Sequence, residues 1–444
     1  MTGGVDAANP QRAGGRIRVM VVDDQAIIRR GLGLMLALES DIEVVGQAAD
    51  GQEAVELAAV TRPDVVLMDL QMPRLSGVAA TRAITSALAG GTLGAYQGGV
   101  FEALCESYRE PTWLAGISIG AINAALIAGN PPGARTARLR EFRDLVSASG
   151  GPYAFAADES LRETLNDASA ASVLLFGVPG FFVPRVPAPP FRPRGTPAAI
   201  SYYDTAPLPQ TLERLVDFDR INSGATRLSV GAVNVRTGNF AYFDSASQPI
   251  DARHIMASGA LPPGFPPVEI DGEHYWDGGL VSNTPLQYVL DQPGTRRRTV
   301  FQVDLFAARG ALPATMAEVT EREKDIRFSS RTRLNTTNEL NQQSIAQAAR
   351  RLLAKLPAAL RKDPDALSLA ALRGESAVDV VHLIYRSKHY ETQAKDFEFS
   401  RRSMLEHWEA GRTDMARTLH DPRWVGRGAD RSGVRVFDLT AAPA

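Results

Sequence analysis

The sequence has a single cysteine, only five lysines and no long hydrophobic run, and each shortage excludes a class of protein. One cysteine, Cys105, excludes an internal disulfide and a zinc site built from cysteines. No apolar segment reaches the roughly 20 residues that a membrane-spanning helix needs. The first 15 residues are polar and glycine-rich, so we expect a disordered N-terminus without a secretion signal, and a cytoplasmic protein.

The charges are balanced, because 48 basic residues stand against 50 acidic ones and the net charge is −2. A surface built to hold nucleic acid needs an excess of basic residues, so no nucleic-acid partner is expected. Apolar residues make up 44% of the chain and charged residues 22%, which is typical of a folded globular protein. At roughly 150 residues per domain, 444 residues predict two or three domains.

The first structured segment, residues 16–84, alternates short apolar runs with helical patterns. Buried parallel strands are predicted at 17–22, 43–48 and 65–68, with a helix after each. The order β-α-β-α-β-α is typical of a doubly wound α/β sheet. Asp23 and Asp24 follow the first strand and Asp69 follows the third, so three carboxylates should meet at one sheet edge. Such a cluster suits Mg²⁺, which prefers oxygen ligands.

This segment resembles a bacterial response-regulator receiver domain through MVVDDQ, VVLMDLQMP and the Ser76-Gly77 that follows. The resemblance implies that Asp69 accepts a phosphoryl group, that a sensor kinase is the partner, and that the three acids hold Mg²⁺. A receiver continues with two more strands, the fourth ending in Ser or Thr and the fifth in Lys. Here no lysine precedes Lys324, so the receiver is truncated. The alternative is an inherited acid cluster without signalling use.

Residues 116–120, Gly-Ile-Ser-Ile-Gly, form a G-x-S-x-G motif between a predicted strand at 113–117 and a predicted helix at 119–128. Glycines avoid clashes on such a sharp turn, which lifts the serine hydroxyl above the sheet at a helix N-terminus. Ser118 is therefore a candidate nucleophile, and the alternative is an ordinary glycine-rich turn.

Two further motifs can support such a nucleophile. Residues 90–94, Gly-Gly-Thr-Leu-Gly, precede a predicted helix at 95–104, whose backbone N–H groups can bind the oxyanion of an acyl intermediate. This loop lacks the Gly-Lys-Ser/Thr ending of a nucleotide-binding loop. Residues 275–279, Tyr-Trp-Asp-Gly-Gly, place Asp277 on a turn, where it is either a catalytic base or simply a turn residue.

The glycine loop, GISIG and DGG, in this order, resemble the patatin-like phospholipase family, as does ASGALPPGFPPVEIDGEHYWDGGLVSNTPL. The resemblance implies a three-layer α/β/α sandwich that hydrolyses lipid or phospholipid acyl esters with a Ser-Asp dyad and no cofactor. Ser118 would be the nucleophile and Asp277 its base. The implied glycine positions are Gly90, Gly91 and Gly94 in the oxyanion loop, and Gly116, Gly120, Gly278 and Gly279 in the motifs.

The predicted domains are a disordered terminus at 1–15, a truncated receiver at 16–86, the hydrolase at 87–310 and a mostly helical extension at 311–444. The tail resembles the C-terminal extension of one bacterial branch of the family. The family enters the glycine loop by an apolar strand and three glycines, whereas ITSALA and Ala89 stand here, so that strand is short or missing.

Three hypotheses follow: a lipid acyl hydrolase, a hydrolase controlled by phosphorylation of Asp69, and an inactive fusion in which the junction at 84–91 spoils the oxyanion loop. A Ser-Asp-His triad is a rival mechanism, because histidines follow Asp277 at His382, His389, His407 and His420.

Two segments suggest contact with lipid. Phe181, Phe182 and Phe191 lie among prolines and either line the substrate entrance or fold onto the core. Helical spacing of Ile345, Ala349 and Leu352 beside basic residues indicates either a helix docked on the core or a peripheral membrane contact.

Overall fold

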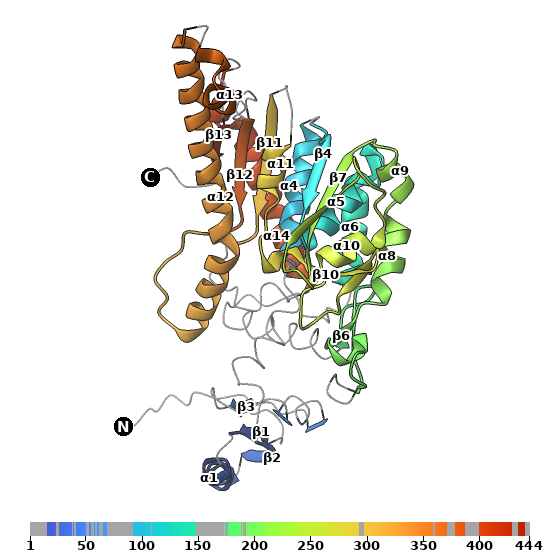
Figure 1. Ribbon diagram of the computed structural model, residues 1–444. Helices are drawn as coiled ribbons and strands as arrows, with labels where there is room; N and C mark the ends of the chain where they lie inside the picture. Colours follow the sequence, from blue (N-terminus) through green and yellow to red (C-terminus); the bar gives the residue numbers. More distant parts are fainter. Residues whose placement is uncertain are drawn as a thin grey trace, which may run out of the picture. The chain divides into compact units, whose positions relative to one another are not determined.

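The computed structural model divides the chain into two compact units, Met1–Thr85 and Ser86–Ala444 (Figure 1). It describes residues 16–23, 26–37, 41–49, 65–68, 92–107, 109–147, 176–187, 192–292, 297–357, 360–370, 378–386, 399–428 and 434–439, with a few isolated positions between them.

The N-terminal unit holds three parallel strands in the order β2-β1-β3, with β1 at Ile17–Val22, β2 at Ile42–Ala48 and β3 at Val65–Met68. Helix α1, Ala26–Ala37, follows β1, as the apolar pattern predicted. Met20 and Val22 alternate onto one face of β1 and are buried with Ala48 and Ala54. The described part therefore has the predicted parallel α/β order.

Much of the predicted receiver lies outside the described residues. Asp24, Asp69 and the predicted helix at 78–84 belong to those stretches. Of the three clustered acids only Asp23 is described, and it is buried at the end of β1. The proposed Mg²⁺ site at these acids therefore stays a prediction.

The second unit contains a five-stranded sheet in the order β4-β7-β10-β9, with β8 also paired to β7. Its strands are β4 (Trp113–Gly116), β7 (Arg227–Asn234), β8 (Phe240–Asp244), β9 (Val268–Ile270) and β10 (Glu273–Asp277). β4 is parallel to β7, whereas β8, β9 and β10 form antiparallel pairs. Leu228, Val230 and Ala232 of β7 are fully buried, as expected of a central strand.

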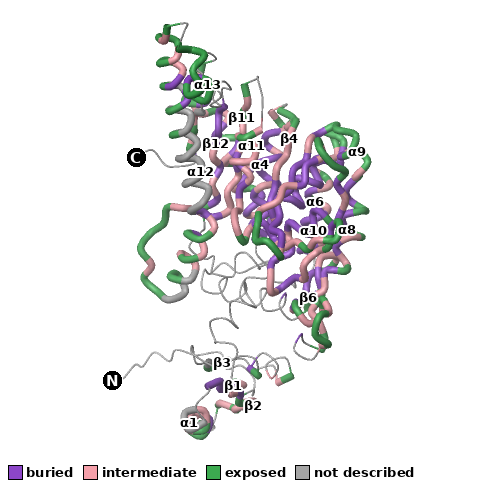
Figure 2. The backbone as a smooth tube through the Cα atoms, viewed as in Figure 1, coloured by how far each residue is buried: buried purple, intermediate pink, exposed green. Residues whose placement is uncertain are grey.

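Helices cover this sheet and supply most of its core. They are α4 (Gly94–Glu106), α5 (Ile119–Ala128), α6 (Arg135–Val146), α8 (Pro207–Leu215), α9 (Phe218–Asn222), α10 (Ala252–Ser258) and α11 (Leu286–Asp291). Nine of the ten residues of α5 are buried, because its sequence is almost entirely small and apolar. Figure 2 shows the buried residues gathered around α6, α10 and the neighbouring strands.

The region after residue 311 is mostly helical, as predicted, and it also contributes two strands. Its helices are α12 (Met316–Lys355), α13 (Pro364–Ala370), α14 (Arg401–His420) and α15 (Pro422–Val425). Strands β12 (Val378–Ile384) and β13 (Val434–Asp438) extend β11 (Arg298–Asp304) into a parallel sheet of the order β11-β12-β13. A short pair, β5 (Val183–Pro184) and β6 (Tyr203–Asp204), lies in the proline-rich stretch.

Helix α14 packs directly on α4 (Figure 1). Glycines make this possible, because a Cβ atom on Gly99 would clash with the backbone carbonyl of Trp408, and one on Gly411 with the carbonyl of Tyr96. The indole of Trp408 donates a hydrogen bond of 2.6 Å to Glu102 of α4. The C-terminal segment is thus part of the support for α4.

A cavity of about 520 Å³ lies beside β4 and β11. It is lined by residues 113–117 and 297–303, and also by side chains of α4 and α5. Among the described strands, β4 pairs only with β7 and β11 only with β12. No described strand fills this space, and residues 82–91, which lead to α4, lie outside the described part of the chain.

Candidate active site

Ser118 lies on a sharp turn between β4 and α5. Its φ is 55° and its ψ is −126°, a conformation that residues other than glycine rarely adopt. The Ser118 N–H group donates to the carbonyl of Ser258 at 3.1 Å and to Oγ of Ser258 at 3.0 Å. Ser258 Oγ in turn donates to the carbonyl of Gly231 at 2.6 Å. The end of α10 and the central strand β7 therefore hold the strained turn in place.

Gly116 and Gly120, the two glycines of the G-x-S-x-G motif, have different structural roles. A Cβ atom on Gly116 would clash with the backbone of Gly120, so only glycine fits at the first position. A Cβ atom on Gly120 would lie 3.6 Å from Nε2 of Gln97, which is ordinary contact. The first glycine is thus demanded by the tight turn, and the second is not demanded by its neighbours.

Asp277 ends β10 and is only 1% exposed. Its N–H group donates to the carbonyl of Ala260 at 3.0 Å, and its Oδ1 accepts a hydrogen bond of 2.7 Å from the N–H group of Gly279. Burial raises the pKa of Asp277 to about 7, although hydrogen bonds from the Ser118 side chain and from Gly279 act to lower it. The structure thus brings together the two residues that the sequence predicted as nucleophile and base.

The glycines after Asp277 allow close packing under this carboxylate. A Cβ atom on Gly278 would lie 2.7 Å from the carbonyl of Gly231, and one on Gly279 would lie 2.6 Å from Oδ1 of Asn283. Gly278 therefore keeps the end of β10 near β7 and near Ile117, and Gly279 allows Asn283 to approach the Asp277 carboxylate.

Of the predicted oxyanion loop, Gly94 is described, whereas Gly90 and Gly91 lie outside the described residues. Gly94 is the first residue of α4, and a Cβ atom on it would lie 2.5 Å from Cγ1 of Ile119. Within the described residues, neither the N–H group of Gly94 nor that of Ile119 has a hydrogen-bond acceptor. Two neighbouring helices thus present N–H groups beside Ser118, an arrangement that can bind an anion.

Ser118 and Asp277 line a small pocket of about 60 Å³. Its polar wall includes Gln97, Asn283 and Asp304, and its apolar wall includes Ile117, Leu261, Leu305, Phe306 and Phe328. Desolvation raises the pKa of Asp304 to about 7, although a hydrogen bond from Gln302 acts to lower it. Nε2 of Gln302 lies 2.9 and 3.1 Å from the two carboxylate oxygens. Sequence reasoning missed Asp304; its only signal is an acid within the apolar run at 299–306, which favours a buried strand, and in the structure it is the last residue of β11.

No described histidine lines this pocket. His382 is on β12, where burial lowers its pKa, and His407 is buried in α14 against the ring of Tyr385. His420 is at the end of α14, with Nδ1 2.8 Å from the carbonyl of Ala416. His389 lies outside the described residues. The described geometry therefore favours the dyad over the triad.

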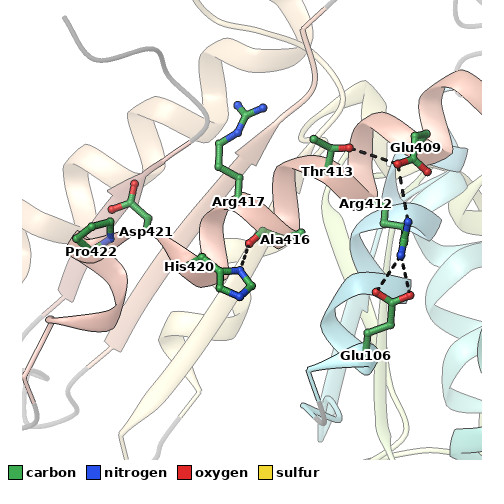
Figure 3. A pocket seen from close by; sticks show the side chains of 9 residues that line it. All are labelled: Glu106, Glu409, Arg412, Thr413, Ala416, Arg417, His420, Asp421 and Pro422. Carbon is green, nitrogen blue, oxygen red and sulfur yellow. Dashed lines mark hydrogen bonds and ion pairs between the residues drawn. The ribbon is translucent and has the colours of Figure 1, made fainter.

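A larger hollow of about 670 Å³ lies away from these residues, between α14 and the end of α4 (Figure 3). Arg412 lies 3.3 Å from Glu106 and 3.9 Å from Glu409, so its charge is already paired. The lining contains none of the predicted site residues and is wide open to solvent, so it offers no enclosed site for chemistry.

The segments with predicted lipid contact have different environments. Phe182 is fully buried and packs on Phe181, Tyr203 and Phe265, which supports folding onto the core, whereas Phe191 lies outside the described residues. On α12, Ala349 is buried but Ile345 and Leu352 are exposed.

The described residues contain neither a membrane-spanning helix nor a cluster of metal-binding side chains. The longer helices among them are too polar to span a bilayer. None of the described His, Cys, Asp and Glu side chains gather in threes that could hold a metal ion.

Three family models match parts of the chain. Residues 89–290 match a model described as patatin-like phospholipase, residues 326–431 one described as patatin phospholipase, and residues 19–90 the response regulator receiver domain. The chain therefore carries a patatin-like phospholipase domain preceded by a receiver segment, which confirms both resemblances and the α/β fold. A hydrolase is the class of protein that this domain supports.

Individual relatives match over limited lengths. The transcriptional regulatory protein YxjL of Bacillus subtilis is 47% identical over 73 residues, 16% of this chain and 34% of that protein. A protein-glutamate methylesterase/protein-glutamine glutaminase of Alkalilimnicola ehrlichii is 32% identical over 257 residues, 56% of this chain and 59% of that protein. The chain thus spans less than two thirds of the length of these curated relatives.

Among solved structures, VipD from Legionella pneumophila covers 73% of this chain and 66% of its own, with 15% identity and a TM-score of 0.27.

Proposed function

We propose that the chain hydrolyses acyl esters of lipids or phospholipids through a Ser118–Asp277 dyad. One observation carries the proposal: a serine on a strained strand-to-helix turn donates a hydrogen bond to a fully buried carboxylate whose pKa is raised to about 7. A base with a pKa near the working pH can both accept and return a proton.

The reaction would use these groups in two stages. Asp277 takes the proton of Ser118 Oγ as the oxygen attacks the ester carbonyl carbon, and the N–H groups of Gly94 and Ile119 stabilise the resulting oxyanion. The C–O bond then breaks, and Asp277 returns the proton to the departing alcohol. In the second stage Asp277 deprotonates a water molecule that attacks the acyl-enzyme, which releases the fatty acid and restores Ser118. No cofactor takes part in these steps.

The apolar wall of the small pocket supports an acyl substrate, because Leu261, Leu305 and Phe306 can contact hydrocarbon near the reacting carbon. The receiver segment supports a sensor kinase as an additional partner, with phosphoryl transfer to Asp69 as the proposed event. Contact of the protein with a membrane surface remains a proposal that the exposed Ile345 and Leu352 would serve.

The test is covalent labelling by a fluorophosphonate together with hydrolysis of a glycerolipid. Labelling at Ser118 is expected, and Ser118→Ala should lose both labelling and hydrolysis while keeping its fold by circular dichroism. Labelling of another serine, or hydrolysis that survives in Ser118→Ala, would refute the assignment of the nucleophile.

A second candidate is an inactive fusion, and the cavity beside β4 and β11 favours it. Among the described strands, β4 pairs only with β7 and β11 only with β12, and side chains of α4 line the same cavity. An intact, folded protein that neither reacts with the fluorophosphonate nor hydrolyses a glycerolipid would establish this alternative.

A further inference from the structure

A buried arginine lies beneath the first turn of α4, close to the Ser118 turn. Arg143, on α6, is 1% exposed, and its Nη2 donates a hydrogen bond of 2.7 Å to Oδ1 of Asn123 on α5. Asn123 is 4% exposed and donates through Nδ2 to the carbonyl of Gly94 at 3.0 Å and to Oε1 of Gln97 at 2.7 Å. One chain of hydrogen bonds therefore joins α6, α5 and the start of α4.

The guanidinium group also determines which residue fits at position 94. A Cβ atom on Gly94 would lie 2.5 Å from Nη2 of Arg143 and 2.5 Å from Cγ1 of Ile119. The backbone of Gly94 is not in the left-handed region, so close approach rather than turn geometry requires this glycine. Any side chain here would push α4 away from both Arg143 and the residue that follows Ser118.

We propose that Arg143 and Asn123 are positioning residues that hold the N–H groups of Gly94 and Ile119 in place for the oxyanion. This inference rests on the proposed function. Oxyanion donors act because they are fixed before charge develops, so a small shift of α4 relative to α5 is costly for the rate.

The positive charge of Arg143 also stabilises the proposed oxyanion. Burial lowers the pKa of Arg143 to about 9, which still leaves the guanidinium protonated at neutral pH. A cation against the first residue of α4 adds to the positive end of the helix dipole, and both favour a negative oxygen beside Ser118.

The experiment compares Arg143→Met with the unchanged full-length protein on a soluble p-nitrophenyl ester. We expect kcat to fall by about 10²-fold and KM to change less than about threefold, because the interaction is realised in the transition state. The rate constant for fluorophosphonate labelling should fall in parallel, since the phosphonyl oxygen uses the same donors. Arg143→Lys should recover part of both rates, because it keeps the charge but not the planar donor.

Two further variants sharpen the test. Asn123→Leu should resemble Arg143→Met, and the double variant should be little worse than either, because the residues act as one unit. Arg138→Met is the matched control. Arg138 is on the same helix, and its ion pair among the described residues is with the half-buried Glu141 at 2.6 Å, so its loss removes the same charge without touching α4.

Each outcome decides the matter. In one outcome, Arg143→Met lowers the thermal midpoint, but its kcat, divided by the amount of labelled Ser118, equals that of the unchanged protein. The arginine is then structural only, and the inference is wrong. If Arg143→Met does not fold, Arg143→Lys and Asn123→Leu are judged by the same ratio of kcat to labelled serine. If the unchanged protein is not labelled at Ser118, the proposed function fails first, and this inference fails with it.

Discussion

Two buried carboxyl groups face the Ser118 pocket with their pKa raised to about 7, and only one of them is proposed to act as a base. Asp277 must be ionised to accept the serine proton. We therefore expect kcat/KM to rise tenfold per pH unit below about 7 and to level off above it. Asp304→Asn should keep this acid limb, because Asp304 takes no proton from Ser118. Asp277→Asn should remove nearly all activity at every pH.

The same pKa has a consequence for stability. The pKa of Asp277 is higher in the folded protein than in the unfolded chain. The contribution of protonated Asp277 to the free energy of unfolding is therefore fully present below about pH 4 and is lost as the pH rises through about 7. A difference of roughly three pH units corresponds to about 4 kcal/mol when the buried group is fully ionised. Asp277→Asn, which cannot ionise, should therefore gain about that much in unfolding free energy over the unchanged protein between pH 4 and pH 9.

Urea denaturation at both pH values measures this gain, and pH–rate profiles on the p-nitrophenyl ester measure the acid limb. Asp304→Asn is the matched comparison, since it removes the second group that titrates in the same range. An acid limb near pH 4 would refute the dyad reasoning, because a base with an ordinary carboxyl pKa is not desolvated. A limb that disappears in Asp304→Asn would transfer the role of base to that residue.

Three other results are expected. Replacing His382, His389, His407 or His420 singly by Gln should leave most hydrolysis, because no described histidine lines the Ser118 pocket; a loss as large as that of Asp277→Asn would restore the triad. A phosphoryl donor should change the rate of hydrolysis less than about twofold, and Asp69→Asn should not alter that rate. A switch needs two states that interact differently with the phosphoryl group. A several-fold effect of the donor that Asp69→Asn removes would contradict this prediction. Gly99→Ala should lower the unfolding free energy by about 1–3 kcal/mol in thermal melts, because the methyl group would clash with Trp408 of α14. Gly133→Ala is the control and should be nearly neutral, because a Cβ atom there meets nothing within 4 Å. Equal melting temperatures of the two variants would disprove this packing.

The local parts of the candidate site could be predicted from the sequence because they are built from adjacent residues. The strand predicted at 113–117 and the helix predicted at 119–128 occur at 113–116 and 119–128. Apolar runs, small residues and glycines set these elements and the turn between them. Asp277 at the end of its strand follows from the same kind of local pattern.

The supporting contacts could not be predicted, because they join residues that are far apart in the chain. Asn123 lies 29 residues from Gly94 and 20 from Arg143, and no periodicity links them. One signal was present: an asparagine inside a helix of small apolar residues will be buried, and a buried amide needs partners. The sequence does not say that the partners are a guanidinium group and the first turn of α4.

The inactive-fusion alternative places a defect at the junction of residues 84–91, beside β4, and the described contacts indicate which part of the proposed machinery such a defect would weaken. Ser118 follows β4 and is held by Ser258 and Gly231, and Asp277 ends β10, so the nucleophile and base both depend on the continuous five-stranded sheet. The start of α4 is different, since its described ties are Asn123, Arg143 and the packing of α14. A defect beside β4 would therefore act on the oxyanion donors before it acted on the dyad. We expect the fusion to lower kcat while Ser118 still reacts, slowly, with a fluorophosphonate.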